Sequence, residues 1–184
     1  MTQIKPLTIE EAEGPAKALL EGVKAKIGTV PNIFGALAQS PSTLEAYLGF
    51  SGSLGKGSLS AQLREQIALT VAGRNACDYC ASAHTVMAKG AGVSAEEAKL
   101  NLAGQASDAR TTAALTFANV LVDQRGRIKE EDVAAVREAG FTDGEIIEIV
   151  GNVAVNIFTN YFNHVAGTEV DFPLVSAQDV SRAA

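Results

Sequence analysis

The sequence predicts an all-helical protein, and three observations support this fold class. Ala, Leu and Glu, which favour helices, dominate the chain, and no long segment alternates apolar and polar residues as a strand would. Residue types that begin and end helices recur at short intervals throughout the sequence. Several of the segments between them are apolar around much of the helix circumference, which is typical of buried helices or of subunit interfaces.

The N-terminal third contains three predicted helices. Thr8 and Glu11 form a capping-box pattern, which predicts a helix from Thr8 to its end at Gly28. A short helix is expected over residues 31–38, where proline occupies the first position. Ser40 and the proline after it open a third helix, which ends in the glycine- and serine-rich segment that follows.

The middle of the chain predicts two helices joined by a short break. Ser60 opens the first of them, which runs to the break at residues 73–75. A second helix is expected over residues 76–91 with Asn75 as its N-cap. Asp78 would then occupy the third helical position, close to the positive end of the helix dipole.

Four further helices are predicted in the C-terminal half. Ser94 with Glu97, and Thr142 with Glu145, repeat the capping-box pattern. Asp108 is a good N-cap residue for the helix between them. The expected bounds of the four helices are 94–104, 108–125, 129–139 and 142–166.

The chain is expected to form one domain covering residues 1–184. Within it, residues 1–59 form an N-terminal helical segment, residues 60–167 form the core, and residues 168–184 form an irregular tail. A length of 184 residues suits a single domain with a substantial buried core.

Composition excludes several classes of function. The net charge of −6 and the absence of Lys and Arg clusters argue against a nucleic-acid partner. Charged and amide side chains interrupt the longest apolar stretch, residues 146–158, so no membrane span is expected. The N-terminus lacks a signal-peptide pattern, and we therefore expect a cytoplasmic protein. In that compartment two cysteines are more often catalytic or metal-binding than structural.

Both cysteines and one of the two histidines lie within the segment CDYCASAH, residues 77–84. On a helix, Cys77, Cys80 and His84 are at i, i+3 and i+7, along one face. Thiols at i and i+3 are close enough to form a disulfide, and the first turns of a helix favour the thiolate. His84 lies one turn beyond Cys80 and could hydrogen-bond its sulfur or accept its proton.

Glu65 is expected to join this cluster. If the helices on either side of residues 73–75 form an antiparallel hairpin, Glu65 and His84 are equally far from the turn and face each other. Glu65 also lies within the apolar arc of its helix, where an unpaired carboxylate would be costly. A carboxylate that orients the imidazole, which in turn accepts a thiol proton, is an arrangement typical of nucleophilic catalysis.

Two arguments favour different cysteines as the nucleophile. Cys77 is closer to the helix start and so gains more from the helix dipole, whereas Cys80 is closer to His84. We favour Cys80, because a hydrogen-bonded base acts directly on the thiol proton.

The motif E-x11-C-x-x-C-x-x-x-H, formed by Glu65, Cys77, Cys80 and His84, resembles the alkylhydroperoxidase AhpD-like proteins of the carboxymuconolactone decarboxylase superfamily, in particular their peroxidase-related subgroup. The resemblance implies an AhpD-like helical bundle with the CxxC motif at a helix N-terminus, assembled as a homo-oligomer. It also implies a thiol-dependent peroxidase that reduces hydroperoxides.

By position in the motif, Cys80 matches the cysteine that attacks peroxide, Cys77 the resolving cysteine, and Glu65 with His84 the proton relay. The resemblance implies no cofactor besides the redox-active Cys77–Cys80 disulfide. The implied partners are a hydroperoxide substrate and an external dithiol reductant or redox protein. One position departs from the family pattern, which has histidine just before the second cysteine, where this chain has Tyr79.

Other residues leave alternatives open. An asparagine stripe on the last predicted helix would either bond neighbouring helices or line a substrate pocket; its members are Asn152, Asn156, Asn160 and Asn163. Tyr79, Asn156 and Asn160 are the candidate pocket residues. Alternative functions are a lactone decarboxylase of the same superfamily and a non-catalytic structural or zinc-binding oligomer module, with Cys77, Cys80 and His84 as zinc ligands and Glu65 or His164 as the fourth. We expect no metal, and a capping role for His164.

Overall fold

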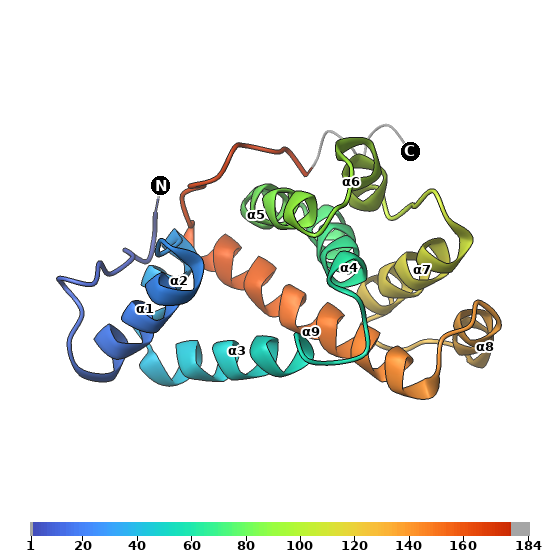
Figure 1. Ribbon diagram of the computed structural model, residues 1–184, viewed down its shortest axis with the longest axis horizontal. Coiled ribbons are helices and arrows are strands. Elements are labelled where there is room, and N and C mark those ends of the chain that lie inside the picture. Colours follow the sequence, from blue (N-terminus) through green and yellow to red (C-terminus); the bar gives the residue numbers. More distant parts are fainter. Residues whose placement is uncertain (1, 178–184) are drawn as a thin grey trace.

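The computed structural model describes residues 2–177, and this part of the chain contains nine α-helices and no strand (Figure 1). The all-helical prediction is therefore confirmed for these residues. Within the same range, no helix has both the length and the apolar character needed to cross a membrane. The helices are α1 Gly14–Ile27, α2 Asn32–Leu37, α3 Pro41–Leu54, α4 Ala61–Arg74, α5 Asp78–Gly90, α6 Ala95–Leu102, α7 Ala109–Asp123, α8 Glu130–Glu138 and α9 Asp143–Ala166.

Helix α4 lies at the centre of the fold and packs against α5, α6, α7 and α9. Its residues 66–73 are all buried, which explains why this segment is apolar around most of its circumference. At Gly73, a Cβ atom would collide with the carbonyl oxygen of Leu102 on α6. Glycine at this position therefore allows the close approach of α6 to α4.

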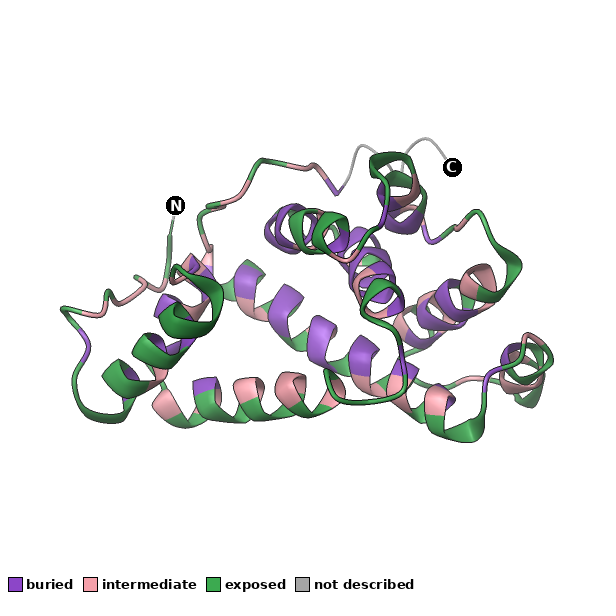
Figure 2. Ribbon diagram, viewed as in Figure 1, coloured by how far each residue is buried: buried purple, intermediate pink, exposed green. Residues whose placement is uncertain are grey.

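Two groups of buried apolar side chains fill the interior. The first joins α1, α3, α4 and α5; it includes Leu20, Leu44 and Leu69, and both cysteines belong to it. The second joins α4, α7 and α9 and includes Leu115 and Ile149. Figure 2 shows a continuous line of buried residues along α9, the longest helix, on the side that faces α4. One side of α9 therefore lies against the cysteine-containing end of α5.

Helix α1 begins later than the sequence predicts. The capping-box hydrogen bonds of Thr8 and Glu11 are present, at 3.0 and 3.2 Å between backbone nitrogen and side-chain oxygen. They close only a turn, and the helix starts at Gly14, where φ is 52°. The residue before a proline is disfavoured in the right-handed helical conformation, and Pro15 therefore prevents a helix from running through Gly14.

The N-cap of α5 is Cys77, so the prediction of Asn75 was wrong. Ala76 has a φ of 52°, in the left-handed region, which interrupts the helical path after α4. Asp78 is consequently the first residue of α5 and not the third. The tight turn places Cys77 at the helix start, where its sulfur accepts a hydrogen bond from the Cys80 amide at 3.5 Å.

The C-terminal segment after α9 is irregular over residues 168–177, as expected, and crosses over α5 (Figure 1). The Val175 amide donates to Ser82 Oγ at 2.9 Å, and the Ala177 amide donates to Asp78 Oδ1 at 2.8 Å. These bonds attach the segment to the same turns of α5 that contain the cysteines. The rest of the predicted tail, residues 178–184, lies outside the described residues.

Candidate active site

Glu65 on α4 and His84 on α5 form a hydrogen-bonded pair, as counting across the turn predicts. Glu65 Oε2 lies 2.8 Å from His84 Nδ1, and the two side chains are only 21% and 18% exposed. A carboxylate in this position holds a proton on Nδ1 and leaves Nε2 free to act as a base. The pair can therefore accept a proton at a defined atom.

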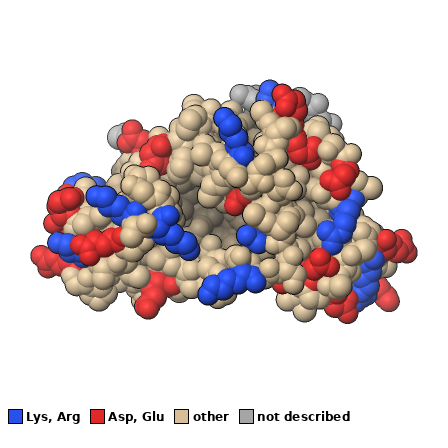
Figure 3. All heavy atoms as spheres, viewed as in Figure 1, with Lys and Arg blue, Asp and Glu red and all other residues tan. Residues whose placement is uncertain are grey.

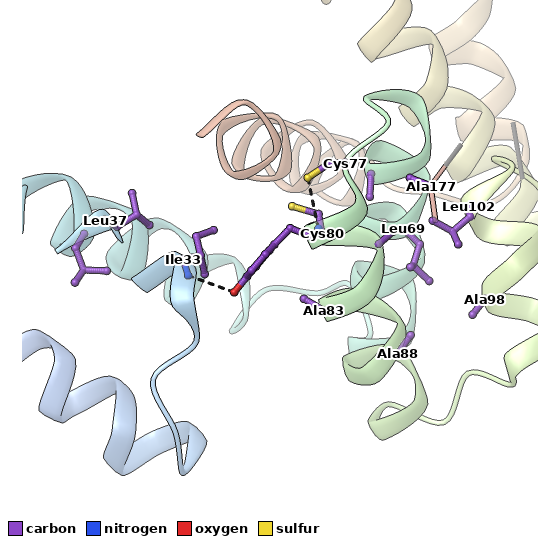
Figure 4. Close-up of a cluster of buried hydrophobic side chains, with 14 of the residues drawn as sticks. Ile33, Leu37, Leu69, Cys77, Cys80, Ala83, Ala88, Ala98, Leu102 and Ala177 are labelled. Atoms are coloured by element: carbon purple, nitrogen blue, oxygen red, sulfur yellow. Dashed lines mark hydrogen bonds between the residues drawn. The ribbon is translucent and has the colours of Figure 1, made fainter. Parts of the chain in front are cut away.

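Cys77 and Cys80 are free thiols and are almost fully buried, with exposed fractions of 1% and 2%. Figure 4 shows both sulfur atoms on the side of α5 that faces α9. The Asn163 side-chain amide of α9 donates to Cys80 Sγ at 3.2 Å, and Thr159 Oγ1 lies 3.9 Å from the same sulfur. Residues of α9 thus supply polar partners for Cys80.

The two thiols differ in acidity. The neighbouring Cys77 thiol, followed by the Asn163 amide and the Thr159 hydroxyl, lowers the pKa of Cys80, although burial acts in the opposite direction. The pKa of Cys77 is raised, because the Cys80 sulfur competes for its proton and because Cys77 is buried. Cys80 is therefore the thiol prepared to ionise.

The expected hydrogen bond between His84 and Cys80 is absent from the described residues, so that expectation is corrected. The only hydrogen-bond partner of the His84 ring in this part of the chain is Glu65. One turn along a helix brings two side chains to the same face, but their contact depends on the direction in which each points. Asn163 occupies a position next to the Cys80 sulfur. A proton passing from Cys80 to His84 would need a bridging water or a substrate atom.

A cavity of about 210 Å³ opens onto the Glu65–His84 pair. Its other walls include Tyr47 and Ser51 of α3 and Arg64 of α4. Burial raises the pKa of Tyr47 to about 12, so its hydroxyl stays protonated and can donate a hydrogen bond. Sequence reasoning missed all three residues. No local pattern indicates that α3, with Tyr47 and Ser51, faces this region, and nothing in the sequence distinguishes Arg64 of α4 from a surface cation.

The asparagine stripe of α9 has two roles. Asn152 and Asn156 line the cavity, while their amides donate to backbone carbonyls one turn earlier in α9. Asn160 lies deeper and accepts a bond from Asn75 Nδ2 at 3.0 Å, which fastens the α4–α5 turn to α9. Asn163 contacts Cys80. The periodic spacing of the stripe was the signal that could have identified Asn163 as a site residue.

Of the three predicted pocket residues, Asn156 lines the cavity, whereas Asn160 and Tyr79 are not among the described residues that form its walls. Asn160 is fully buried in the contact between α9 and the α4–α5 turn. The Tyr79 hydroxyl accepts a hydrogen bond from the Ile33 amide of α2 at 3.2 Å, drawn as a dashed line in Figure 4. The Tyr79 ring packs edge-on against Phe172. Tyr79 therefore connects α5 to α2 and to the C-terminal segment.

The zinc alternative lacks a cluster of ligands. Within residues 2–177, no group of three or more His, Cys, Asp or Glu side chains is arranged to hold a metal ion. His164, the proposed fourth ligand, is exposed in the last turn of α9. A histidine in the last turn is close to the negative end of the helix dipole, as its expected capping role requires.

The fold and the buried thiol pair define an all-helical protein with a CxxC motif at a helix start. Residues 41–123 match the model of the carboxymuconolactone decarboxylase family. No curated protein matches the chain by sequence. The solved structures that resemble it include an AhpD-core, peroxidase-related protein from Ralstonia eutropha JMP134, with a TM-score of 0.82 and 24% identity over 93% of this chain and 94% of that one.

Two further structures have the same fold. A peroxidase-related protein from Silicibacter sp. TM1040 has a TM-score of 0.78 and 25% identity, over 91% of this chain and 92% of its own. The debrominase Bmp8, as a cysteine-to-alanine variant with 2,3,4-tribromopyrrole, has a TM-score of 0.78 and 19% identity, over 100% and 95%. Residues 41–123 are therefore similar to the carboxymuconolactone decarboxylase family, and the fold is that of AhpD-core, peroxidase-related proteins.

Proposed function

We propose that the protein is a dithiol-dependent peroxidase that reduces hydroperoxides at Cys80. One observation carries the proposal: the Cys80 sulfur has an amide donor at 3.2 Å and a second thiol as its helix-start neighbour. Hydrogen bonds to a sulfur anion favour the thiolate, which is the form that attacks peroxide. The Glu65–His84 pair supports the proposal, because it can supply the proton that the leaving group needs.

The reaction has three steps. In the first step, the Cys80 thiol passes its proton through a bridging water to Nε2 of His84, and the thiolate attacks one oxygen of the hydroperoxide. The O–O bond breaks, and the leaving alkoxide takes the proton from His84 Nε2 to become an alcohol. Cys80 is then a sulfenic acid. The Cys77 sulfur attacks it, a disulfide forms, and the hydroxyl group leaves with the Cys77 proton as water. An external dithiol reduces the disulfide by thiol–disulfide exchange and is itself oxidised.

The burial of both thiols sets a condition on this cycle. The cavity reaches Glu65 and His84, but among the described residues neither cysteine lines it. Peroxide therefore needs a small local opening between α5 and α9, or between α5 and the C-terminal segment, to reach Cys80. Local openings of this kind are common where a segment makes few contacts with the rest of the fold.

The test is stopped-flow oxidation of the reduced protein by tert-butyl hydroperoxide. The parent should lose two thiols per peroxide consumed. Cys77→Ser should stop at one sulfenic acid per chain, which dimedone traps, and Cys80→Ser should not react above the buffer rate. If Cys80→Ser consumed peroxide as fast as the parent, Cys80 would not be the attacking thiol and the proposal would fail.

The same protein preparation separates the alternatives. Lactone decarboxylation would continue after both thiols are alkylated, whereas peroxide reduction would stop. A structural zinc site would give one zinc per chain by elemental analysis, lost on Cys→Ser substitution. Because Bmp8 has the same fold, 2,3,4-tribromopyrrole with a dithiol reductant belongs in the assay. Bromide release without peroxide turnover would replace the proposed reaction.

A further inference from the structure

A second and larger hollow adjoins the cavity at His84. This groove has a volume of about 580 Å³ and runs between α1, α3 and the exposed side of α5. Tyr47, Ser51 and Gly55 line both the groove and the smaller cavity, so the two meet along α3. Figure 3 shows a hollow at the centre of this face of the molecule. A volume of this size is typical of small-molecule sites.

The groove is mostly apolar and partly open to solvent. Leu19, Val23 and Ile27 of α1 form one wall, and Met87 of α5 belongs to another. Ile27 is 51% exposed and Met87 44% exposed, so the groove presents large apolar side chains to solvent. Met87 follows His84 by three residues on α5, so the apolar surface continues towards the proposed proton relay.

Basic residues accompany the apolar surface. Lys26 and Lys56 line the groove, and Arg64 lines the adjoining cavity. Within residues 2–177, neither lysine takes part in an ion pair, although the protein has a net charge of −6. Figure 3 shows Lys and Arg side chains around the edge of the hollow. Because Lys26 and Lys56 are the charged residues that line the groove within the described chain, the groove suits an anion and not another cation.

Two glycines keep the groove open. Gly22 lies inside α1 and Gly52 inside α3, and both line the groove. At each position a Cβ atom would meet no described atom within 4 Å. The packing of the helices therefore does not require glycine at either position, and the space beside each Cα is open. Glycine weakens a helix interior relative to alanine. Larger side chains at these positions would project into the space that a ligand could occupy.

We propose that this groove binds the apolar chain of a long-chain carboxylate, with its carboxylate at Lys26 and Lys56. The inference rests on the proposed function, because the substrate it names is a fatty-acid-like hydroperoxide whose reacting group is directed towards His84. The wall formed by α1 lies outside residues 41–123, which match the family model. Gly52, Lys56 and Met87, on the other walls, lie within the matched residues, so the groove combines the N-terminal segment with the region that matches the family model.

The test first measures binding without any reaction. Isothermal titration calorimetry with dodecanoate should detect binding to the parent. Gly52→Trp, which fills the groove, should weaken binding at least tenfold. Gly49→Trp is the matched control on the exposed side of α3, where a Cβ atom again meets no described atom within 4 Å, and it should bind like the parent. Melting temperatures of the two variants check that both fold.

The charge is tested separately. A Lys26→Ser/Lys56→Ser double variant should lose several-fold in affinity for dodecanoate, and high salt should reduce the difference from the parent. Equal affinity in the parent and the double variant would overturn the assigned position of the carboxylate.

Turnover then separates the two proposals. Gly52→Trp should lower kcat/KM at least tenfold for a long-chain fatty-acid hydroperoxide and leave hydrogen peroxide unaffected. If dodecanoate binds but no peroxide is reduced, the proposed function fails and the groove assignment stands. If peroxide is reduced but dodecanoate does not bind, the groove assignment fails. A parent oligomer that Gly52→Trp dissociates, without dodecanoate binding, would assign the groove to a second copy of the chain.

Discussion

Glu65 Oε2 lies 2.8 Å from His84 Nδ1 across the α4–α5 hairpin, and both side chains are largely shielded from solvent. This pair meets the condition for a general base, because the carboxylate selects the imidazole tautomer and leaves the other ring nitrogen available. Removing the imidazole should therefore affect proton transfer without removing either thiol. The consequence can be measured against a second histidine in the same chain.

We expect His84→Gln to lower kcat/KM for hydroperoxide on the order of 100-fold, the usual contribution of a positioned acid or base. Glu65→Gln should lower it as well, because the amide no longer holds a proton on Nδ1. His164→Gln, at an exposed position on α9, is the matched control and should behave like the parent. Equal rates for His84→Gln and His164→Gln would remove the relay from the mechanism.

Asn163→Leu should raise the pKa of Cys80. The Asn163 amide is one of the groups that lower this pKa, and leucine removes the donor at nearly constant volume. The alkylation rate follows the thiolate fraction, so the rate profile should move to higher pH. At pH 7 the rate should fall about tenfold, the value of one hydrogen bond to a charged group. Iodoacetamide kinetics from pH 5 to 10 measure the shift.

The control for this measurement is Asn119→Leu. Asn119 lies on α7, where its amide donates to the Gly104 carbonyl oxygen. Its removal should leave the alkylation profile in place. An identical profile for Asn163→Leu and the parent would mean that the amide does not stabilise the thiolate.

Ser82→Ala should make the thiols more accessible. Ser82 Oγ accepts the Val175 amide at 2.9 Å and so attaches the C-terminal segment to α5. Ser82→Ala removes this bond and the longer one from Ser82 Oγ to the Val175 carbonyl oxygen. Loss of about 1 kcal/mol should increase local opening, and the rate of thiol alkylation, about fivefold. Thr85→Ala is the control, because among residues 2–177 the Thr85 hydroxyl bonds only its own helix, at the Ala81 carbonyl. Equal rates for the two variants would indicate that peroxide enters elsewhere.

Glu148→Gln should reduce the free energy of unfolding at neutral pH by about 1 kcal/mol, the usual value of a capping interaction. The Glu148 carboxylate on α9 accepts the amides of Ser58 and Leu59, at 2.9 and 3.0 Å, and these bonds lower its pKa from 4.5. A lowered pKa in the folded state means that the stabilisation is present above pH 4.5 and is lost as pH falls through the folded value.

The difference between Glu148→Gln and the parent should therefore shrink on acidification. Urea unfolding at pH 7 and at pH 3 measures it. Glu21→Gln, at an exposed position on α1, is the control and should change stability little at either pH. A difference that grows at low pH would contradict the assigned cause.

Local pattern predicted the helices well. The Thr142–Glu145 capping box and the glycine end of α1 at Gly28 are present in the structure. A helix cap satisfies backbone groups within one turn of the helix end, so it forms without any contact from the rest of the fold. The Glu65–His84 pair was also predictable, because a short turn makes the facing positions of a hairpin a matter of counting.

The residues that hydrogen-bond the Cys80 sulfur could be identified only from the tertiary structure. Asn163 and Thr159 are about 80 residues away from Cys80, at 83 and 79 positions, and no sequence period connects them. The left-handed conformation of Ala76, which makes Cys77 the N-cap, was likewise hidden, because alanine is ordinarily a helix former. Such contacts depend on how helices cross, which no single segment specifies.

By itself, the sequence determined that two thiols, a histidine and a glutamate lie on adjacent helices, because helical period and hairpin symmetry are local properties. Only the tertiary structure decided what surrounds them: α9 supplies the donor to Cys80, and α3 supplies Tyr47 to the cavity. It also placed α1 against α3 to form the apolar groove. The physical reason is that the hydrophobic effect, which drives helix packing, has no preferred direction. The same apolar pattern on each helix is therefore compatible with many arrangements of the helices, and only the packing of all the side chains together selects one.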